Sequence, residues 1–228
     1  MKFKYKAQTS LYELTKLKTI CLSLSVSSNG KYFGMYCKDK HYRVFNFETG
    51  KLIREFNESL KYYVENYSDI LKHEIMKIDK QYYDKKLGVE KEIERDIDVL
   101  PPNNIQFDET NTYLMFPTLL GIKLYDLHKG NLVKIIGKNE NERFLTMGLF
   151  QGKALRNNSG LIGTGGASSQ GDKVVDPILF TIAYKRNRFY MFTKREPADV
   201  DKSTKRDILN ERPTDRDIQL YSQSNSKH

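Results

Sequence analysis

The sequence predicts an all-β fold built from repeated antiparallel sheets and interrupted by one helical stretch. Two observations carry this prediction. Short alternating apolar runs are separated by turn residues such as Gly and Asn, and the four-run pattern returns further along the chain. The hydrophobic content of 39%, including many aromatic residues, is enough for a packed core in a chain of 228 residues. No apolar run approaches the roughly 20 residues of a membrane span, which excludes an integral membrane protein.

The first four-stranded unit is predicted over residues 20–56. Its four runs are expected to form strands at residues 21–26, 32–37, 42–47 and 52–56. Turn sequences such as Asn29-Gly30 and Thr49-Gly50 separate the runs, which favours hairpins and an antiparallel meander. Cys21 and Cys37 each lie inside an apolar run, so both are interpreted as buried thiols of an intracellular protein without disulfides.

The pattern returns twice after residue 103. The aromatic anchors of the three third strands are Phe45, Tyr125 and Phe192, which lie too far apart for a simple repeat. Two insertions, residues 57–102 and a Gly/Ser loop at 153–176, account for the excess. Their removal leaves a period of about 40 to 45 residues, which is the period of a four-stranded WD-type blade. The predicted fold is therefore a partial WD40-type β-propeller of about three blades with a helical insertion and a disordered C-terminal tail.

This repeat divides the chain into parts. Residues 1–56 are assigned to one or more blades, with residues 1–17 as the outer strand of an earlier blade, and residues 103–193 to two further blades. Residues 57–102 are predicted to form one or two helices, because apolar residues recur there at helical spacing. This apolar stripe is interpreted as an intramolecular contact rather than a partner helix, and consists of Leu60, Val64, Tyr67 and Leu71. Residues 194–228 are polar and charged, as in a solvated linker.

The ends of the three third strands correspond to the position of the WD dipeptide in such blades. The residues there are Phe45-Asn46, Tyr125-Asp126 and Phe192-Thr193. Asp126 and the hairpin residue Asp39 are interpreted as carboxylates that bond their own backbone, and not as an acid–base pair.

No catalytic, cofactor-binding or metal site is predicted. The Gly163-Thr164-Gly165-Gly166 cluster lacks the helix that a phosphate-binding loop requires directly after it, so it is interpreted as an inter-strand loop. The four histidines are scattered and the two cysteines have no CxxC spacing. Neither a metal site nor an activated thiol is therefore expected.

The net charge of +9 is spread unevenly along the chain. Basic residues prevail in residues 1–56 and 153–193, and acidic residues prevail in residues 57–100, which excludes a single basic tail for nucleic acid. The basic residues of two turns are expected on one rim with the acidic insertion: Lys38, Lys40, His41, Lys185, Arg186 and Arg188. These turns either bind an acidic protein or an RNA backbone, or form a solvated face that the insertion partly neutralises.

Long stretches of the sequence resemble a known family. They include YRVFNFETGKL at 42–52, FDET at 107–110, LGIK at 120–123 and KRNRFYMFTKREP at 185–197. These residues resemble the WD-repeat proteins that carry a cyclophilin-type peptidyl-prolyl isomerase domain, over residues 5–213. The resemblance implies later WD blades and the linker toward the isomerase domain, in a nuclear, spliceosome-associated protein.

The signature of the cyclophilin domain itself is missing, since the chain has no Phe-His-Arg stretch and no Trp. Catalytic residues of the family therefore cannot be carried over to any position. The expected function is a non-catalytic protein-interaction scaffold with spliceosomal protein partners. An isomerase label would come through the parent protein, and an RNA-binding module is the weaker alternative. The chain is expected to be a fragment whose missing blades and cyclophilin domain leave open blade faces.

Overall fold

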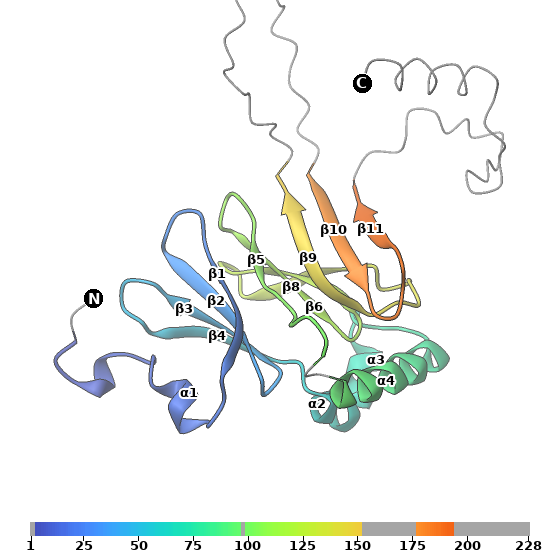
Figure 1. The fold of residues 1–228 in the computed structure, drawn as a ribbon, viewed down its shortest axis with the longest axis horizontal. Helices are drawn as coiled ribbons and strands as arrows, with labels where there is room; N and C mark the ends of the chain where they lie inside the picture. Colours follow the sequence, from blue (N-terminus) through green and yellow to red (C-terminus); the bar gives the residue numbers. More distant parts are fainter. Residues whose placement is uncertain (1–2, 97–98, 152–176, 194–228) are drawn as a thin grey trace, which may run out of the picture. The chain divides into compact units, whose positions relative to one another are not determined.

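The computed structural model describes residues 3–96, 99–151 and 177–193. Three antiparallel sheets follow one another along the chain, and each corresponds to one predicted unit (Figure 1). The predicted Gly/Ser loop at 153–176 and the predicted tail at 194–228 lie outside the described residues. Among the described helices, none is long and apolar enough to cross a membrane.

Blade 1 is a four-stranded meander in which each strand pairs with the next one along the chain. Its strands are β1 (Cys21–Val26), β2 (Tyr32–Cys37), β3 (His41–Asn46) and β4 (Leu52–Asn57). Gly30 and Gly50 hold positive φ angles of 67° and 61° in the two hairpins, which explains the Gly at the end of both turn sequences.

Blade 2 repeats this order, and blade 3 has three strands within the described residues. Blade 2 consists of β5 (Gln106–Phe107), β6 (Tyr113–Thr118), β7 (Gly121–Asp126) and β8 (Asn131–Ile136). Blade 3 consists of β9 (Phe144–Phe150), β10 (Ile178–Ala183) and β11 (Phe189–Phe192). The first strands of successive blades contact each other, as they do around the axis of a propeller. The predicted partial propeller of about three blades is confirmed.

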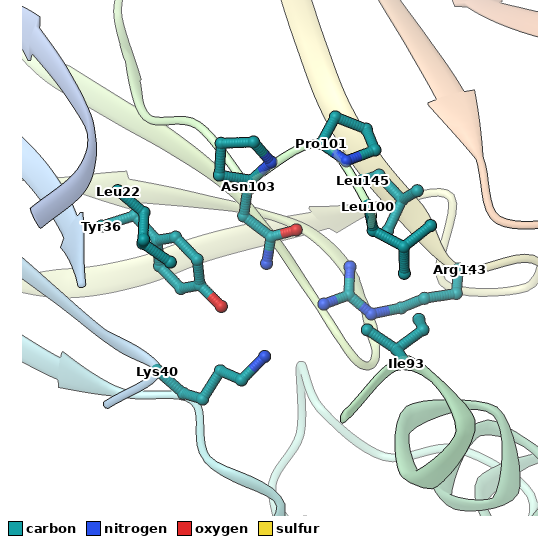
Figure 2. Close-up of a pocket in the computed structure, with 10 residues that line it drawn as sticks. Leu22, Tyr36, Lys40, Ile93, Leu100, Pro101, Asn103, Arg143 and Leu145 are labelled. Carbon is teal, nitrogen blue, oxygen red and sulfur yellow. The ribbon is translucent and has the colours of Figure 1, made fainter. Parts of the chain in front are cut away.

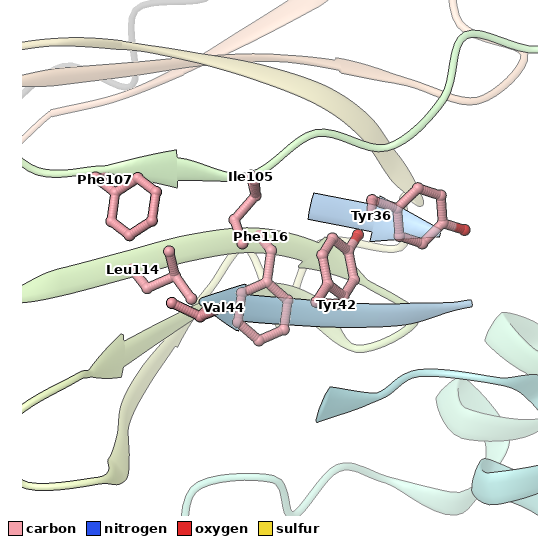
Figure 3. Packing of buried hydrophobic residues seen from close by; sticks show 7 residues of the cluster. All are labelled: Tyr36, Tyr42, Val44, Ile105, Phe107, Leu114 and Phe116. Atoms are coloured by element: carbon pink, nitrogen blue, oxygen red, sulfur yellow. The ribbon is translucent and has the colours of Figure 1, made fainter. Parts of the chain in front are cut away.

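The blades pack face to face in sequence order. Between blades 1 and 2 lies a buried aromatic cluster: Tyr36, Tyr42, Val44, Ile105, Phe107, Leu114 and Phe116 (Figure 3). The Tyr42 and Phe116 ring centroids are 4.5 Å apart, and the Tyr42 hydroxyl donates to the Pro117 carbonyl at 2.7 Å. Removing a fully buried ring such as Phe116 costs about 3–5 kcal/mol. This interface is therefore a principal source of stability.

The predicted helical insertion consists of three helices rather than one or two. They are α2 (Leu60–Glu65), α3 (Tyr67–Lys72) and α4 (Lys80–Arg95). Their buried side chains Tyr63, Ile70 and Tyr83 pack on Leu119 and Leu120 in the β6–β7 turn of blade 2. The intramolecular contact is thus present, but Val64 of the predicted stripe is 53% exposed. The preceding residue, Tyr63, packs on blade 2 in place of Val64, so the buried face of α2 is offset by one residue from the predicted stripe.

The N-terminal segment corrects a prediction. Residues 3–17 form no strand but a short 3-10 helix, η1 (Lys6–Gln8), and the helical turn α1 (Glu13–Lys16). Leu11, Leu14 and Leu17 are spaced three apart, which is a helical and not a strand period. Leu14 packs against the face of blade 1 that points away from blade 2, beside Phe33 and Phe45.

The prediction that both cysteines are buried is wrong for one of them. Cys37 is buried, whereas Cys21 is exposed. The pairing of β1 with β2 shifts register between Cys21 and Ser23, and the Cys21 thiol then donates to the Ser23 carbonyl at 3.2 Å. The bulge turns the first residue of the strand toward solvent.

Candidate functional site

One rim of the blades carries the helical insertion and the β2–β3 and β10–β11 turns. Helix α4 begins at Asp79, whose side chain accepts a hydrogen bond from the Gln81 backbone N–H at 2.8 Å. The buried positions of α4 follow helical spacing: Tyr83, Lys86, Glu90 and Ile93. Two of the four are charged, so the helix docks through polar as well as apolar contacts.

The charged positions of α4 hold the segment that leads into blade 3. Glu90 pairs with Arg143 at 2.7 Å, and both side chains are at most 5% exposed. Lys86 Nζ donates to the carbonyls of Glu140 and Glu142 at 2.9 and 3.2 Å. Burial opposes the positive charge of Arg143, but the Glu90 carboxylate outweighs burial and raises its pKa. Burial, and then the charge of Arg143, lower the pKa of Lys86 to about 8.

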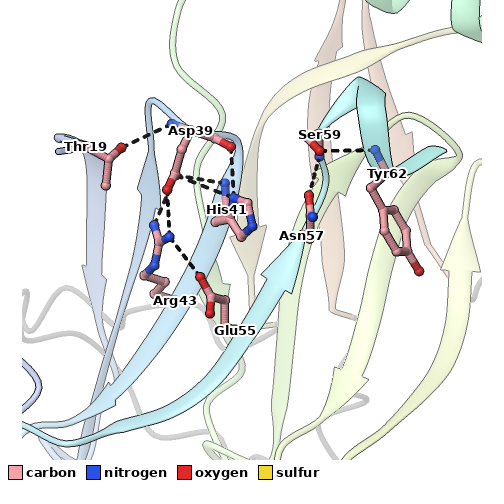
Figure 4. Close-up of polar contacts among 8 residues, drawn as sticks. All are labelled: Thr19, Asp39, His41, Arg43, Glu55, Asn57, Ser59 and Tyr62. Atoms are coloured by element: carbon pink, nitrogen blue, oxygen red, sulfur yellow. Dashed lines mark hydrogen bonds and ion pairs between the residues drawn. The ribbon is translucent and has the colours of Figure 1, made fainter. Parts of the chain in front are cut away.

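The start of the insertion is anchored to blade 2. Glu58 pairs with Lys123 of β7 at 2.5 Å and also accepts a hydrogen bond from the Tyr63 hydroxyl. The Ser59 side chain caps α2 by accepting from the Tyr62 backbone N–H at 3.2 Å (Figure 4). The insertion is therefore fixed at both ends.

The β2–β3 turn of blade 1 is held by Asp39. Its carboxylate accepts from Arg43 at 2.6 Å, and Arg43 also pairs with Glu55 at 2.8 Å (Figure 4). Asp39 also accepts from the His41 backbone N–H at 3.2 Å, in agreement with its interpretation as a turn carboxylate. Burial alone would raise the pKa of Asp39, but the hydrogen bond and charge of Arg43 lower it overall.

The rim carries all six basic-turn residues, but most lie beside a polar partner. Lys185 pairs with Glu92 of α4 at 3.0 Å, and Arg186 and Arg188 pair with Glu142 at 2.9 and 3.5 Å. The His41 ring contacts the Asp39 carbonyl, and Lys38 is exposed. These pairs favour the interpretation of a partly neutralised face for blade 3, and the binding hypothesis stays a prediction.

Lys40 differs from the other five. It is half-buried, and its ammonium forms no hydrogen bond or ion pair within the described residues. Burial lowers the pKa of Lys40. Its backbone has a left-handed φ of 65°, as does that of the matching Lys185 at 54° in blade 3. The chain thus tolerates strain at this position of the turn.

Lys40 points into a cavity of about 220 Å³, the rim pocket, enclosed by blade 1, blade 3, α4 and the loop before blade 2 (Figure 2). Its polar lining is Tyr36, Lys40, Asn103 and Arg143, and its apolar lining is Leu22, Ile93, Leu100, Pro101, Pro102 and Leu145. Tyr36 is only 4% exposed, but its hydroxyl is not one of the fully buried atoms without a partner and is open to the pocket. Burial raises the pKa of Tyr36, so its hydroxyl stays protonated at neutral pH.

The other two polar groups of the rim pocket are occupied. Arg143 is bonded to Glu90 and to the Phe144 carbonyl. With its amide oriented to satisfy both atoms, Asn103 donates to the Leu145 carbonyl at 3.1 Å and accepts from Arg143 at 3.2 Å. The pocket therefore offers two unused donors, one of them charged, within an apolar wall.

The predicted dipeptide positions lie at equivalent places at the ends of β3, β7 and β11. Asn46 accepts from the Thr49 backbone N–H at 2.8 Å, and Asp126 accepts from the His128 and Lys129 backbone N–H groups at 2.9 and 2.8 Å. Thr193 directly follows β11 and is exposed. Phe45 is buried and Tyr125 half-buried, and Phe192 packs edge-on to Phe144. Asn46 and Asp126 thus cap the following turns.

Sequence reasoning missed Tyr36, Arg143 and Asn103, which come together from positions far apart in the chain. It also missed Lys86 and Glu90, which did leave a signal. They occupy positions between Tyr83 and Ile93 that a helix with this spacing must bury. Among residues 3–96, 99–151 and 177–193, no group of His, Cys, Asp and Glu is placed to hold a metal ion.

Comparison with known proteins finds relatives that are named as peptidyl-prolyl isomerases. No protein-family model matches it. It is 34% identical over 97% of its length to the human "Peptidylprolyl isomerase domain and WD repeat-containing protein 1". It is 38% identical over 92% of its length to the Arabidopsis thaliana "Peptidyl-prolyl cis-trans isomerase CYP71". A solved β-propeller domain of Cps50 (Swd1) from Myceliophteria_thermophila covers 56% of this chain and 32% of its own at 13% identity, with a TM-score of 0.33.

The chain spans 34% of the length of both curated relatives. The similarity extends over nearly the whole chain, including the stretches at 42–52 and 107–110 that carry the resemblance. The resemblance to the WD-repeat proteins with a peptidyl-prolyl isomerase domain is therefore confirmed, and this chain is homologous to about one third of such a protein.

Proposed function

We propose that this chain is a non-catalytic protein-interaction scaffold. Its rim binds a partner protein and, in a polypeptide like its relatives, places a cyclophilin-type isomerase beside its clients. The relatives carry isomerase names, and the matched region here is built of WD-type blades. Tethering raises the effective concentration of a client without any new catalytic contact. The partners are spliceosomal proteins and the location is the nucleus, as the family resemblance implies.

One observation carries this function: buried ion pairs join the helical insertion to blade 2 and to the segment that leads into blade 3. Buried pairs fix the insertion at Glu58–Lys123 and at Glu90–Arg143. Exposed Lys38 and the rim pocket thereby keep a fixed relation to each other. A rigid surface loses little conformational entropy when a partner binds.

The scaffold function is tested by photo-crosslinking of the full chain in nuclear extract. One variant carries the photoreactive residue at Lys38 on the rim, and its control carries it at exposed Lys129 in the opposite β7–β8 turn. We expect discrete protein adducts from position 38 only, and splicing proteins among them by mass spectrometry. Equal adducts from both positions contradict a partner-binding rim, and adducts without splicing proteins contradict that partner class.

The non-catalytic assignment has its own test, since X-Pro isomerisation is slow without a catalyst. A prolyl-isomerase assay on the chain should give the uncatalysed rate. Cyclosporin-sensitive acceleration would overturn the assignment. Imaging of a tagged chain tests the nuclear location, and a purely cytoplasmic signal contradicts it.

RNA binding by the basic turns is the weaker alternative. The net charge of +9 favours it, but Lys185, Arg186 and Arg188 pair with carboxylates. Reversal of Lys38, Lys40, Lys185 and Arg186 to Glu should abolish any salt-sensitive RNA binding. Unchanged binding in that variant excludes these turns as an RNA site.

A further inference from the structure

We infer that the rim pocket binds a carboxylate from a partner protein, namely an Asp or Glu side chain that follows an apolar residue. This assignment rests on the proposed scaffold function and names the chemistry of its partner. It follows from the two unused donors, the charge balance, the apolar wall and the size of the pocket.

The two unused donors come from the same hairpin of blade 1. The Tyr36 hydroxyl and the Lys40 ammonium both point into the rim pocket (Figure 2). The Tyr36 side chain is 4% exposed, but its hydroxyl is not one of the fully buried side-chain atoms that lack a partner. The hydroxyl is therefore open to the pocket and can donate to a ligand oxygen.

The charges around the rim pocket favour a ligand with one negative charge. Glu90 already neutralises Arg143, whose remaining donors go to the Phe144 carbonyl and Asn103. Lys40 is therefore the cation of the pocket whose charge lacks a bonded partner, although Glu90 and Glu94 act on it over a longer range. A carboxylate has two oxygens, one for the ammonium and one for the hydroxyl. A phosphate dianion would require further donors.

The wall and the size fit an amino-acid side chain. Six apolar residues line the pocket, so the group beside the carboxylate must be apolar to avoid an unpaired polar contact. The volume of about 220 Å³ lies below the roughly 300–1,000 Å³ of most small-molecule sites. A carboxylate side chain with one apolar neighbour fits better than a cofactor.

The donors are also held in place before a ligand arrives. The Lys40 backbone N–H donates to the Cys37 carbonyl at 3.0 Å, and the Lys40 carbonyl accepts from Glu58 at 3.1 Å. The Tyr36 ring packs against the Tyr42 ring, with centroids 4.7 Å apart and the planes inclined by 36°. Such preorganisation lowers the entropic cost of binding.

The test uses the full chain and two probes, N-acetyl-leucyl-glutamate amide and its glutamine counterpart. Binding is followed by NMR shifts at millimolar peptide, the range expected for one residue in a small pocket. The glutamate peptide should saturate, with shifts confined to residues around the pocket, and the glutamine peptide should bind at least about tenfold more weakly, the loss of a charge-assisted hydrogen bond.

Two variants separate the donors. Lys40→Met keeps the aliphatic stem and should weaken glutamate-peptide binding at least about tenfold, whereas Tyr36→Phe should weaken it about three- to tenfold. Lys129→Met on the opposite rim is the matched control and should bind like the parent chain. Equal binding of both peptides, or unchanged binding by both pocket variants, overturns the carboxylate assignment. Displacement of the peptide by inorganic phosphate at lower concentration overturns it in favour of a phosphate.

The two proposals fail in different ways. If position 38 still crosslinks to proteins while the glutamate peptide does not bind, the scaffold function stands and the pocket assignment falls. If the peptide binds and position 38 gives no adducts, the rim scaffold falls and the pocket remains a carboxylate site.

Discussion

Arg143 Nε lies 2.7 Å from a carboxylate oxygen of Glu90, and this ion pair is buried between α4 and the entry to blade 3. Three surface pairs lie on the same rim, including Lys185–Glu92, but their lysine and arginine side chains are half exposed or more. Loss of the buried pair should therefore lower the stability of the fold. Solvent screens the three surface pairs, so their loss should matter little.

The first prediction concerns this pair. Glu90→Gln leaves a buried guanidinium without its counter-charge, so the free energy of unfolding should fall by about 3–5 kcal/mol. Urea unfolding followed by circular dichroism measures it. Glu92→Gln on the same helix is the control and should cost less than about 1 kcal/mol. A double variant, Glu90→Leu with Arg143→Met, should recover most of the loss. A small effect of Glu90→Gln alone would contradict a structural role for the pair.

The second prediction follows from Lys86. Below about pH 8 this lysine is protonated in both states, and the folded state bears the cost of burying the charge. Between pH 8 and the ordinary pKa of 10.5, the unfolded lysine stays protonated while the folded one loses its proton. In this range the folded state binds fewer protons than the unfolded state. The contribution of Lys86 to the free energy of unfolding therefore rises with pH, by up to about 1 kcal/mol per pH unit.

Urea titrations at pH 7, 8.5 and 9.5 and constant salt test the slope. Lys86→Met should remove the rise relative to the parent chain, whereas Lys85→Met, at the exposed neighbouring position, should keep it. If the free energy of unfolding rises equally with pH in Lys86→Met and Lys85→Met, the pH dependence comes from a group other than Lys86.

The third prediction concerns the left-handed backbone at Lys40. Glycine adopts this conformation without the side-chain clash, so Lys40→Gly should raise the free energy of unfolding by up to about 1 kcal/mol. Lys38→Gly, two residues earlier, should instead lower it by about 0.5–1 kcal/mol. Thermal melts of both variants show whether each substitution raises or lowers the stability. A stabilised Lys40→Gly chain that no longer binds the glutamate peptide would show that the lysine is kept for binding at a cost in stability.

The fourth prediction concerns an apolar face of blade 3 that is exposed among the described residues. The side chains that point away from blade 2 include Phe180, Ile182, Phe189 and Met191, which are 37–64% exposed. An apolar sheet face of this kind promotes self-association. Light scattering after size-exclusion chromatography should show a mass that grows with concentration and falls in Ile182→Lys. Val133→Lys, at an exposed site on β8, should leave the mass unchanged.

The strands could be predicted because both causes are local: alternation of apolar residues and glycines at left-handed turns. The N-terminal segment before blade 1 could not, because the helical spacing of Leu11, Leu14 and Leu17 is short and the contact of Leu14 depends on the finished sheet. Cys21 was placed wrongly for a related reason. A one-residue bulge reverses the side-chain direction and leaves no mark in the alternation.

The candidate site was predicted only in part. Lys40 was found because it lies in a basic turn, but nothing local distinguishes it from exposed Lys38. What distinguishes Lys40 is its contact with α4 and Arg143, which lie between 40 and about 100 residues further along the chain. The polar positions of α4 show a more general limit. Lys86 and Glu90 sit on the buried stripe, and a search for apolar periodicity alone passes over them.

The two ends of the blade series are unlike each other. A head-to-tail stack, with blade 3 of one copy on blade 1 of the next, would grow without limit. Leu14 of α1 already packs on part of the outer face of blade 1. Among the described residues, the outer face of blade 1 is thus partly covered, whereas the outer face of blade 3 keeps Phe180, Ile182 and Phe189 exposed. The helical turn α1 thereby reduces the apolar area that a head-to-tail contact could bury on blade 1.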